Sequence, residues 1–277
     1  MTSPALQEVI ALLAAPAAGN PAQYLFERAI ETAGLDWRFL TFEVPPERLA
    51  DALTGVAALG LRGCLLAGPL QTAALPLVAT ASPAATFSGA VSLVTRDEAG
   101  GLAGHMTEGR GIVEALRGHI EPAGCRAVVL GAGPTGRATA LELALAGTKE
   151  LVVCDPDVAR ADALVAAVAG LATATATRLD WSATLELPAE TAIVVHALDA
   201  AAVAVRLTGL RPDVVFVEGG LTARPSALAE QAAAAGACVV DGIEVHATRT
   251  AIDFHALTGQ EADTDMLREA LDEFMSA

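Results

Sequence analysis

Lysine and tyrosine are almost absent from the chain. Of its 17 basic residues only Lys149 is a lysine, and Tyr24 is the one tyrosine. A mechanism that needs an amine or a phenol therefore has a single candidate of each kind. The 33 acidic residues outnumber the basic ones and leave a formal net charge of −16, without a basic cluster anywhere. Because nucleic acids are bound by clustered positive charge, this balance argues against a nucleic-acid partner.

Paired cysteines and long apolar runs are also missing. The four cysteines lie far apart and form no CxxC pair: Cys64, Cys125, Cys154 and Cys238. This spacing predicts no metal site and no disulfide framework, so we expect mostly small core residues in a reducing compartment. No apolar run reaches the roughly 18 residues of a membrane helix, and the N-terminus lacks the pattern of a secretion signal. We therefore expect a cytoplasmic protein without a membrane partner, and the sequence leaves a homodimer open.

The residues that are present favour an α/β protein. A chain of 277 residues that is 53% hydrophobic can bury a large core, and its length suggests roughly two domains. In the first hundred residues, short apolar runs alternate with segments of helical spacing, which is typical of a parallel α/β sheet. The predicted strands cover 9–15, 38–44 and 61–68, the predicted helices 21–34, 45–59 and 71–81, and two short strands flank a turn at 98–101.

The strongest motif is a glycine-rich turn between a predicted strand and a predicted helix. An apolar strand leads into Gly131, Gly133 and Gly136, and a helix and a second strand follow. Glycines at this spacing allow a tight turn in which backbone N–H groups approach a pyrophosphate at a helix N-terminus. Pro134 and Thr135 fall where the helix begins, so we expect them beside the cofactor as well.

Asp155 follows the second strand of this motif, where dinucleotide-binding folds carry an acidic residue. A carboxylate there accepts hydrogen bonds from the adenosine ribose and repels a 2′-phosphate, so we predict NAD as the cofactor and NADP as the weaker ligand. Further strands at 191–197, 213–219 and 237–242 would complete a Rossmann-type, doubly wound parallel sheet. The alternative is a Rossmann-like domain that keeps the turn for packing and no longer binds a dinucleotide.

Over nearly its whole length the chain resembles the shikimate dehydrogenase family. The resemblance rests on the segment FSGAVSLVTRDEAGGLAGHMTEGRGIVEAL, the turn GAGPTGRA and the tail DGIEVHATRTAIDFHALTGQEADTDMLREAL. It implies an α/β fold with an N-terminal substrate-binding α/β domain, 1–106, and a Rossmann-type dinucleotide-binding domain, 107–242, opened by a linking helix. The last helices, 243–277, are expected to pack back on the first domain, over the cleft.

The loop RGCLLAGPLQTA resembles the family's substrate loop in frame but not in chemistry. Gly63 and Pro69 match the frame, whereas Gln71 stands where the family has its catalytic lysine. Leu65 and Ala67 stand where the family has polar residues that hold a polyol. An amide such as Gln71 orients a carbonyl but does not carry a proton. Shikimate is therefore expected to be a poor substrate.

The other site positions implied by the resemblance also differ from the family pattern. Glu108 replaces the catalytic Asp and is the candidate base; the alternative is a first-turn carboxylate that stabilises the helix dipole. Asn20 replaces a serine of the carboxylate clamp, and Ser92 replaces a substrate-binding Asn. Arg249, in place of a Gln, is the candidate anchor for a substrate carboxylate. Tyr24 falls in a turn that faces the cleft, or else in the core.

Two functional hypotheses follow. The first is an NAD-dependent oxidoreductase that acts on a small, less hydroxylated, acidic substrate held between the domains, with Glu108 and Gln71 as its catalytic residues. His105 and His246 flank matched segments, and each is either an acid/base or structural. The second is a non-catalytic dinucleotide-binding or sensor protein with a relic cleft, because few polar residues converge there.

Overall fold

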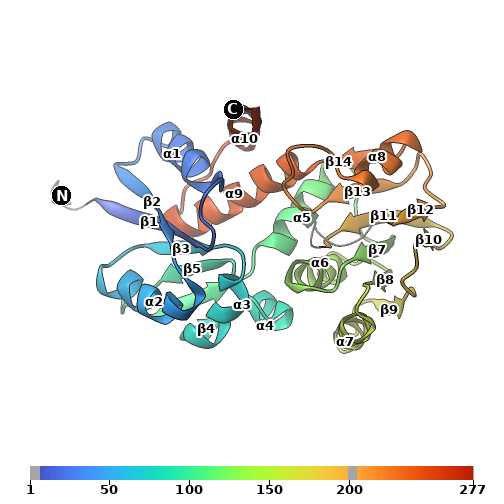
Figure 1. Cartoon of the computed structure of the whole chain (residues 1–277), viewed down its shortest axis with the longest axis horizontal. Helices are drawn as coiled ribbons and strands as arrows, with labels where there is room; N and C mark the ends of the chain where they lie inside the picture. The colour runs from blue at the N-terminus through green and yellow to red at the C-terminus, as the bar shows by residue number, and fades with distance from the viewer. Residues whose placement is uncertain (1–6, 199–204, 277) are drawn as a thin grey trace. The chain divides into compact units, whose positions relative to one another are not determined.

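The computed structural model describes residues 7–198 and 205–276, and these residues form two compact units (Figure 1). One unit extends to Thr107 and resumes at Arg249, and the other is Glu108–Thr248. The second boundary falls inside the long helix α9 (Gly242–Thr258), which begins in one unit and ends in the other. The structure therefore assigns α10 (Thr264–Ser276) and the end of α9 to the first unit.

The first unit is built on a mixed sheet whose described strands have the order β2-β1-β3-β5-β6-β4. The early strands are parallel as predicted, with β1 between β2 and β3. The two short strands around the turn at 98–101 are also present, but they run antiparallel and extend the sheet beyond β3. The strands are β1 (Glu8–Ala14), β2 (Trp37–Glu43), β3 (Gly63–Leu66), β4 (Thr80–Ala81), β5 (Leu93–Arg96) and β6 (Leu102–His105).

The helices of the first unit follow the apolar spacing except where proline intervenes. The helix predicted over 71–81 is wrong, because α3 ends at Ala74 and a 3-10 turn leads into β4. Pro76 in that turn explains the stop, since proline lacks the N–H that a helix requires. The helical segments before the boundary are α1 (Ala22–Thr32), η1 (Pro46–Arg48), α2 (Leu49–Ala58), α3 (Leu70–Ala74), η2 (Leu75–Leu77) and α4 (Pro83–Ser88).

The C-terminal helices pack back on the first unit, as the resemblance implied. The ring of Phe254 in α9 lies 5.9 Å from that of Phe26 in α1, and Phe26 lies 4.7 Å from Phe39 in β2. All three side chains are buried. Burying each of them contributes about 1.5–3 kcal/mol, so the C-terminal segment is part of this unit's core.

The second unit carries an all-parallel sheet whose described strands have the order β14-β13-β11-β7-β8-β9. The order runs outward in both directions from β7, which confirms the predicted doubly wound arrangement. Val128, Val194 and Phe216 are fully buried, as expected of parallel strands covered on both faces. The strands are β7 (Arg126–Leu130), β8 (Glu150–Cys154), β9 (Thr175–Arg178), β11 (Thr191–His196), β13 (Val215–Glu218) and β14 (Cys238–Val240).

The helices of the second unit connect these strands. They are α5 (Glu108–Arg117), α6 (Pro134–Leu145), α7 (Val158–Ala169), α8 (Ala227–Ala234) and the first part of α9. A parallel pair, β10 (Thr184–Glu186) and β12 (Arg206–Thr208), was not expected, because strands of three residues carry too little pattern to predict. In the part of the chain that the structure describes, no helix is long and apolar enough to cross a membrane.

Candidate functional site

The glycine turn leaves β7 and enters α6 in a backbone conformation that needs its glycines. Gly131 has a φ of +113°, and a Cβ there would lie 2.4 Å from the carbonyl oxygen of Ala197. A Cβ on Gly136 would lie 1.9 Å from the carbonyl oxygen of Gly131. A Cβ on Gly133 would meet no protein atom within 4 Å. The first and third glycines therefore close the turn, and the second leaves open space above the helix N-terminus.

A pocket of about 130 Å³ adjoins this turn. Pro134 and Thr135, which the sequence analysis predicted to lie beside the cofactor, both line the pocket at the first turn of α6. N–H groups and the positive end of a helix dipole at this position suit a pyrophosphate. The lining residues are Gly131, Gly133, Pro134, Thr135, Asp155, Pro156, Arg160, Ala197 and Leu198.

Asp155 lines the pocket but also holds the turn together. Its Oδ2 accepts a hydrogen bond from the N–H of Ala132 at 2.7 Å, and its Oδ1 accepts one from the N–H of Asp157 at 2.7 Å. The residue is only 6% exposed. Because each carboxylate oxygen has two lone pairs, one direction on each remains for a ligand hydroxyl.

Arg160 is a residue of this pocket that the sequence analysis missed. It lies in the first turn of α7, and its Nε is 3.3 Å from Oδ2 of Asp157. The guanidinium is largely exposed, so it is the cation that a 2′-phosphate would meet beside Asp155. Its position one helical turn beyond the acidic strand end is the signal that could have revealed it.

Glu108 begins α5 and meets the start of α6. The hydroxyl of Thr135 donates a hydrogen bond to Oε2 of Glu108 at 2.5 Å. The two helices approach closely because Gly109 faces the backbone of Ala138, where a Cβ on Gly109 would lie 2.3 Å from the carbonyl carbon. The candidate base thus stands beside the glycine turn that is predicted to hold the cofactor.

Gln71 and Ser92 come together around the carboxyl end of β3. The Gln71 amide donates to the carbonyl oxygen of Leu66 at 3.0 Å, and the N–H of Leu66 donates to the carbonyl oxygen of Ser92 at 2.9 Å. Ser92 is fully buried, and its Oγ accepts the N–H of Thr107 at 2.9 Å. The structure therefore links the predicted catalytic position Gln71 to the predicted substrate-binding position Ser92 through the backbone of Leu66, although Ser92 itself is fully buried.

Asn20 and Tyr24 lie at the start of α1, where they make local and C-terminal contacts. Asn20 Oδ1 accepts the N–H of Ala22 at 3.0 Å. Tyr24 donates its hydroxyl to Oε2 of Glu273 in α10 at 2.6 Å, an oxygen that Arg28 also contacts at 3.1 Å. The hydrogen bond to Glu273 raises the pKa of the Tyr24 phenol above its ordinary value. Both side chains therefore have partners within the protein, independent of any contact with a substrate.

Arg249 lies on α9 beside a buried carboxylate. Its Nε is 3.4 Å from Oδ2 of Asp253, one turn further along the helix, and the Asp253 side chain is only 2% exposed. The Arg249 side chain is 17% exposed. Its charge is thus partly compensated within the helix, which leaves less of it for a substrate carboxylate than the sequence suggests.

A buried carboxylate and a largely buried imidazole, which the sequence analysis did not single out, end two neighbouring strands. His196 ends β11 and Glu218 ends β13; Nδ1 and Oε1 are 2.8 Å apart, and the side chains are 12% and 6% exposed. Ser226, which caps α8, donates its hydroxyl to the other oxygen of Glu218. Ala197, the next residue after His196, packs against Gly131. Ligands of doubly wound sheets bind at this edge, so the pair adjoins the pocket at the glycine turn.

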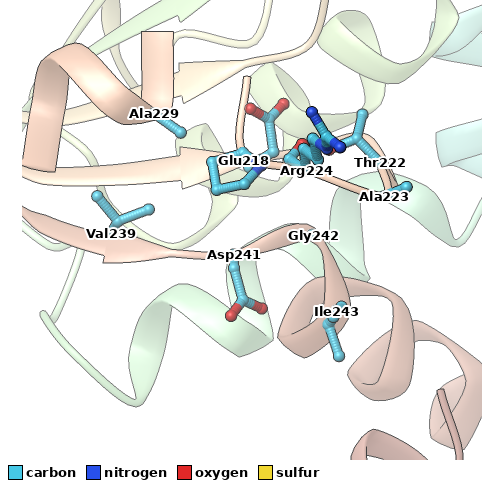
Figure 2. A pocket seen from close by; sticks show the side chains of 10 residues that line it. Glu218, Thr222, Ala223, Arg224, Ala229, Val239, Asp241, Gly242 and Ile243 are labelled. Carbon is cyan, nitrogen blue, oxygen red and sulfur yellow. The ribbon is translucent and has the colours of Figure 1, made fainter. Parts of the chain in front are cut away.

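A second pocket, of about 170 Å³, opens beside Glu218 (Figure 2). Figure 2 shows the carboxylates of Glu218 and Asp241 pointing away from one another, with Arg224 next to Thr222. Oδ1 of Asp241 accepts the N–H of Glu244 at 2.8 Å at the start of α9, so this carboxylate caps a helix. The pocket is lined by Glu218, Thr222, Ala223, Arg224, Pro225, Ala229, Val239, Asp241, Gly242 and Ile243.

Comparison with known sequences identifies relatives along the whole chain. The profile of the shikimate dehydrogenase substrate binding domain matches residues 12–94. A shikimate dehydrogenase (NADP(+)) of Geobacter sulfurreducens is 36% identical over 57% of this chain and 56% of its own length, so that match spans little more than half of the relative. A shikimate dehydrogenase (NADP(+)) of Streptococcus pyogenes serotype M28 is 30% identical over 95% of this chain and 96% of its own length.

Comparison with solved structures finds the same architecture. The ligand-free 5-ketofructose reductase of Gluconobacter sp. strain CHM43 is 28% identical, covers 97% of this chain and 99% of its own, and has a TM-score of 0.89. The shikimate 5-dehydrogenase of Listeria monocytogenes, in complex with shikimate and NAD, is 26% identical, covers 98% of this chain and 99% of its own, and has a TM-score of 0.85. The named relatives and neighbours are thus dehydrogenases and a reductase.

Proposed function

Because the chain belongs to the shikimate dehydrogenase family of oxidoreductases, we propose that it transfers hydride between a nicotinamide dinucleotide and a small substrate held by the first unit. The observation that carries this proposal is the pocket at the glycine turn. There the backbone is open at Gly133, α6 begins, and the carboxylate of Asp155 faces the same space. These groups fit a pyrophosphate and an adenosine ribose.

We propose NAD as the preferred form of the cofactor. The Asp155 carboxylate and Pro156 stand where, by the resemblance, NADP-binding members have a neutral amide and an arginine. The curated relatives are described as NADP(+) enzymes, whereas the Listeria neighbour was solved with NAD. Arg160 would favour NADP, because its guanidinium could pair with a 2′-phosphate. Its ion pair with Asp157 already compensates part of that charge, which favours NAD.

The substrate proposed is a small acidic molecule with fewer hydroxyl groups than shikimate. By the resemblance, Leu65 in β3 and Ala67 just after it stand in place of polar residues, and Gln71 in α3 stands in place of lysine. A polyol would lose hydrogen bonds there, and buried hydroxyls without partners are costly. Arg249 supplies the one cation among the substrate positions proposed from the sequence, and it would bind the acid group.

Two groups in the second unit are the candidates for moving a proton near the cofactor. When bound, the nicotinamide supplies or accepts the hydride. Glu108 stands beside the glycine turn with Thr135 donating to it, and His196 stands at the strand edge with its Nδ1 2.8 Å from Oε1 of Glu218. We propose Glu108 as the base, and His196 is the second candidate, since a close contact with a buried carboxylate is typical of catalytic histidines. Gln71 would orient the substrate carbonyl by hydrogen bonding.

The experiment follows absorbance of the reduced nicotinamide, with NAD and with NADP, over hydroxy acids, cyclitols including shikimate and quinate, amino acids and 5-ketofructose. The expected result is turnover of an acidic substrate with NAD and very slow turnover of shikimate. Robust shikimate oxidation would overturn the proposed substrate. Dinucleotide binding by calorimetry without turnover of any compound would instead support the sensor alternative, which the naming of the relatives as dehydrogenases does not favour.

A further inference from the structure

Three side chains from separate elements of the second unit form a chain of contacts outside the dinucleotide site. Cys238 is the first residue of β14, the edge strand of the sheet, and its side chain is exposed. Its Sγ lies 3.5 Å from Nδ1 of His119, which follows α5. Nε2 of the same ring lies 2.8 Å from Oε1 of Glu244 in the first turn of α9. A thiol, an imidazole and a carboxylate are therefore aligned.

The partners of the ring decide which nitrogen carries the proton. An ionised carboxylate only accepts hydrogen bonds, so Nε2 of His119 must donate to Glu244. In the neutral ring Nδ1 then has a free lone pair, and this lone pair faces the Cys238 thiol. The carboxylate also stabilises the imidazolium that forms when Nδ1 takes the thiol proton. This is the arrangement of an activated nucleophile: a thiol, its base and a group that orients the base.

We propose that Cys238 is a reactive thiol that forms mixed disulfides with low-molecular-weight disulfides, with His119 as its base and Glu244 as the positioning residue. The proton of Cys238 Sγ passes to Nδ1 of His119, and the thiolate attacks one sulfur of the disulfide. A new S–S bond forms, the old one breaks, and the leaving thiolate takes a proton from the imidazolium. The small disulfide is the oxidant, and the departing thiol is the reduced product.

The other three cysteines lack this arrangement and serve as internal references. Cys64 and Cys154 are buried, and burial raises the pKa of each thiol to about 12. Cys125 is partly exposed, its Sγ contacts the carbonyl oxygen of Glu121 at 3.3 Å, and burial raises the pKa of its thiol. Cys125 is thus the matched control for Cys238, because a reagent reaches it but no base faces it in these contacts.

The test compares labelling rates at neutral pH. The folded protein is treated with iodoacetamide and, separately, with oxidised glutathione, and each cysteine is quantified by mass spectrometry over time. A cysteine without a partner is only a few per cent thiolate at pH 7, so Cys238 should react about tenfold faster than Cys125 and faster than itself in the denatured chain. His119→Gln should remove most of this advantage, and Glu244→Gln part of it. Cys238→Ser should abolish adduct formation at this site.

The denatured reference separates activation from mere exposure. If folded Cys238 reacts no faster than in the denatured chain, or if a His119→Gln protein with unchanged thermal unfolding reacts as fast as the wild type, the proposal is wrong. Labelling by iodoacetamide but not by oxidised glutathione would also overturn it, since an activated thiol alone does not make a disulfide-forming site. None of these outcomes depends on whether the chain is an oxidoreductase.

Discussion

The second and third glycines of the dinucleotide turn should respond to the same substitution in opposite ways. Gly133→Ala adds a Cβ that meets no protein atom within 4 Å, at a φ of −70° and a ψ of −175°, which alanine adopts readily. Alanine gains up to about 1 kcal/mol by restricting the unfolded chain. Glycine is the better N-cap by less than about 1 kcal/mol. We therefore expect the free energy of unfolding to change by less than about 1 kcal/mol.

Cofactor affinity should nevertheless fall, because the added methyl group would stand where we propose that the pyrophosphate approaches the backbone. A hydrogen bond to a charged group contributes about 1.5–3 kcal/mol, so losing one weakens NAD about ten- to a hundredfold. Gly136→Ala is the contrasting variant. Its Cβ would lie 1.9 Å from the carbonyl oxygen of Gly131, which forces the turn apart. Overpacking of this kind costs about 1–3 kcal/mol or more and should lower the melting temperature by several degrees.

The assay pairs NAD titration by calorimetry with thermal unfolding for the wild type and both variants. The expected pattern is a stable Gly133→Ala protein that binds weakly and a Gly136→Ala protein that unfolds early. A Gly133→Ala protein that binds NAD as tightly as the wild type would show that the dinucleotide does not pass over this residue. In that case the proposed cofactor site, and not only its details, would be refuted.

Three further predictions concern single side chains. Asp155→Asn removes the charge and leaves one oxygen for the two backbone N–H groups that Asp155 accepts, so the turn should lose some stability while the ratio of NADP to NAD affinity rises about tenfold in calorimetry; a wild type that already prefers NADP, and loses this preference in Arg160→Ala, would make Arg160 the phosphate ligand. Arg249→Ala should weaken an acidic ligand about ten- to a hundredfold at unchanged NAD affinity. Arg249→Ala should also destabilise the protein by about 3 kcal/mol because the buried Asp253 loses this cation. Arg249→Lys should keep the stability but lose the paired hydrogen bonds to the ligand. If Arg249→Ala weakens NAD and the acidic ligand equally, Arg249 does not belong to the substrate site. Burial lowers the pKa of His105, so the folded protein favours the neutral ring. The free energy of unfolding therefore includes a favourable contribution above the ordinary histidine pKa. This contribution is lost as the pH falls below that pKa. Melting temperature between about pH 7 and 5 should therefore fall more steeply in the wild type than in His105→Gln, and parallel slopes would contradict the assignment.

Much of the second unit could be predicted because its signals are local. The apolar run of β7, the glycine spacing and the first turn of α6 are adjacent in sequence, and their conformation is set by backbone sterics at those residues. The prediction for the end of α3 is wrong for a local reason as well, because Pro76 stops the helix although the apolar spacing continues beyond it. The pair β10 and β12 escaped prediction because its stability comes from contacts between segments, not from either strand alone.

The candidate site was predicted less well because its side chains have partners far away in sequence. Asp155 was expected at the ribose, and the structure adds that both of its oxygens hold backbone N–H groups. Tyr24 was placed near the substrate, and the structure pairs it with Glu273 across 249 positions. No sequence motif marks His196 and Glu218 at the ends of their strands. Their contact therefore could not be predicted from composition or spacing.

The sequence by itself determined the alternation of strands and helices and the glycine turn at Gly131 to Gly136. These follow from residue type and near-neighbour spacing, which act before the chain is folded. Only the tertiary structure decided which groups meet: Glu108 with Thr135, His196 with Glu218, and Cys238 with His119 across 119 positions. The physical reason is that hydrogen bonds and proton transfer act over a few ångströms, and that proximity is created by packing between elements rather than by the order of residues along the chain.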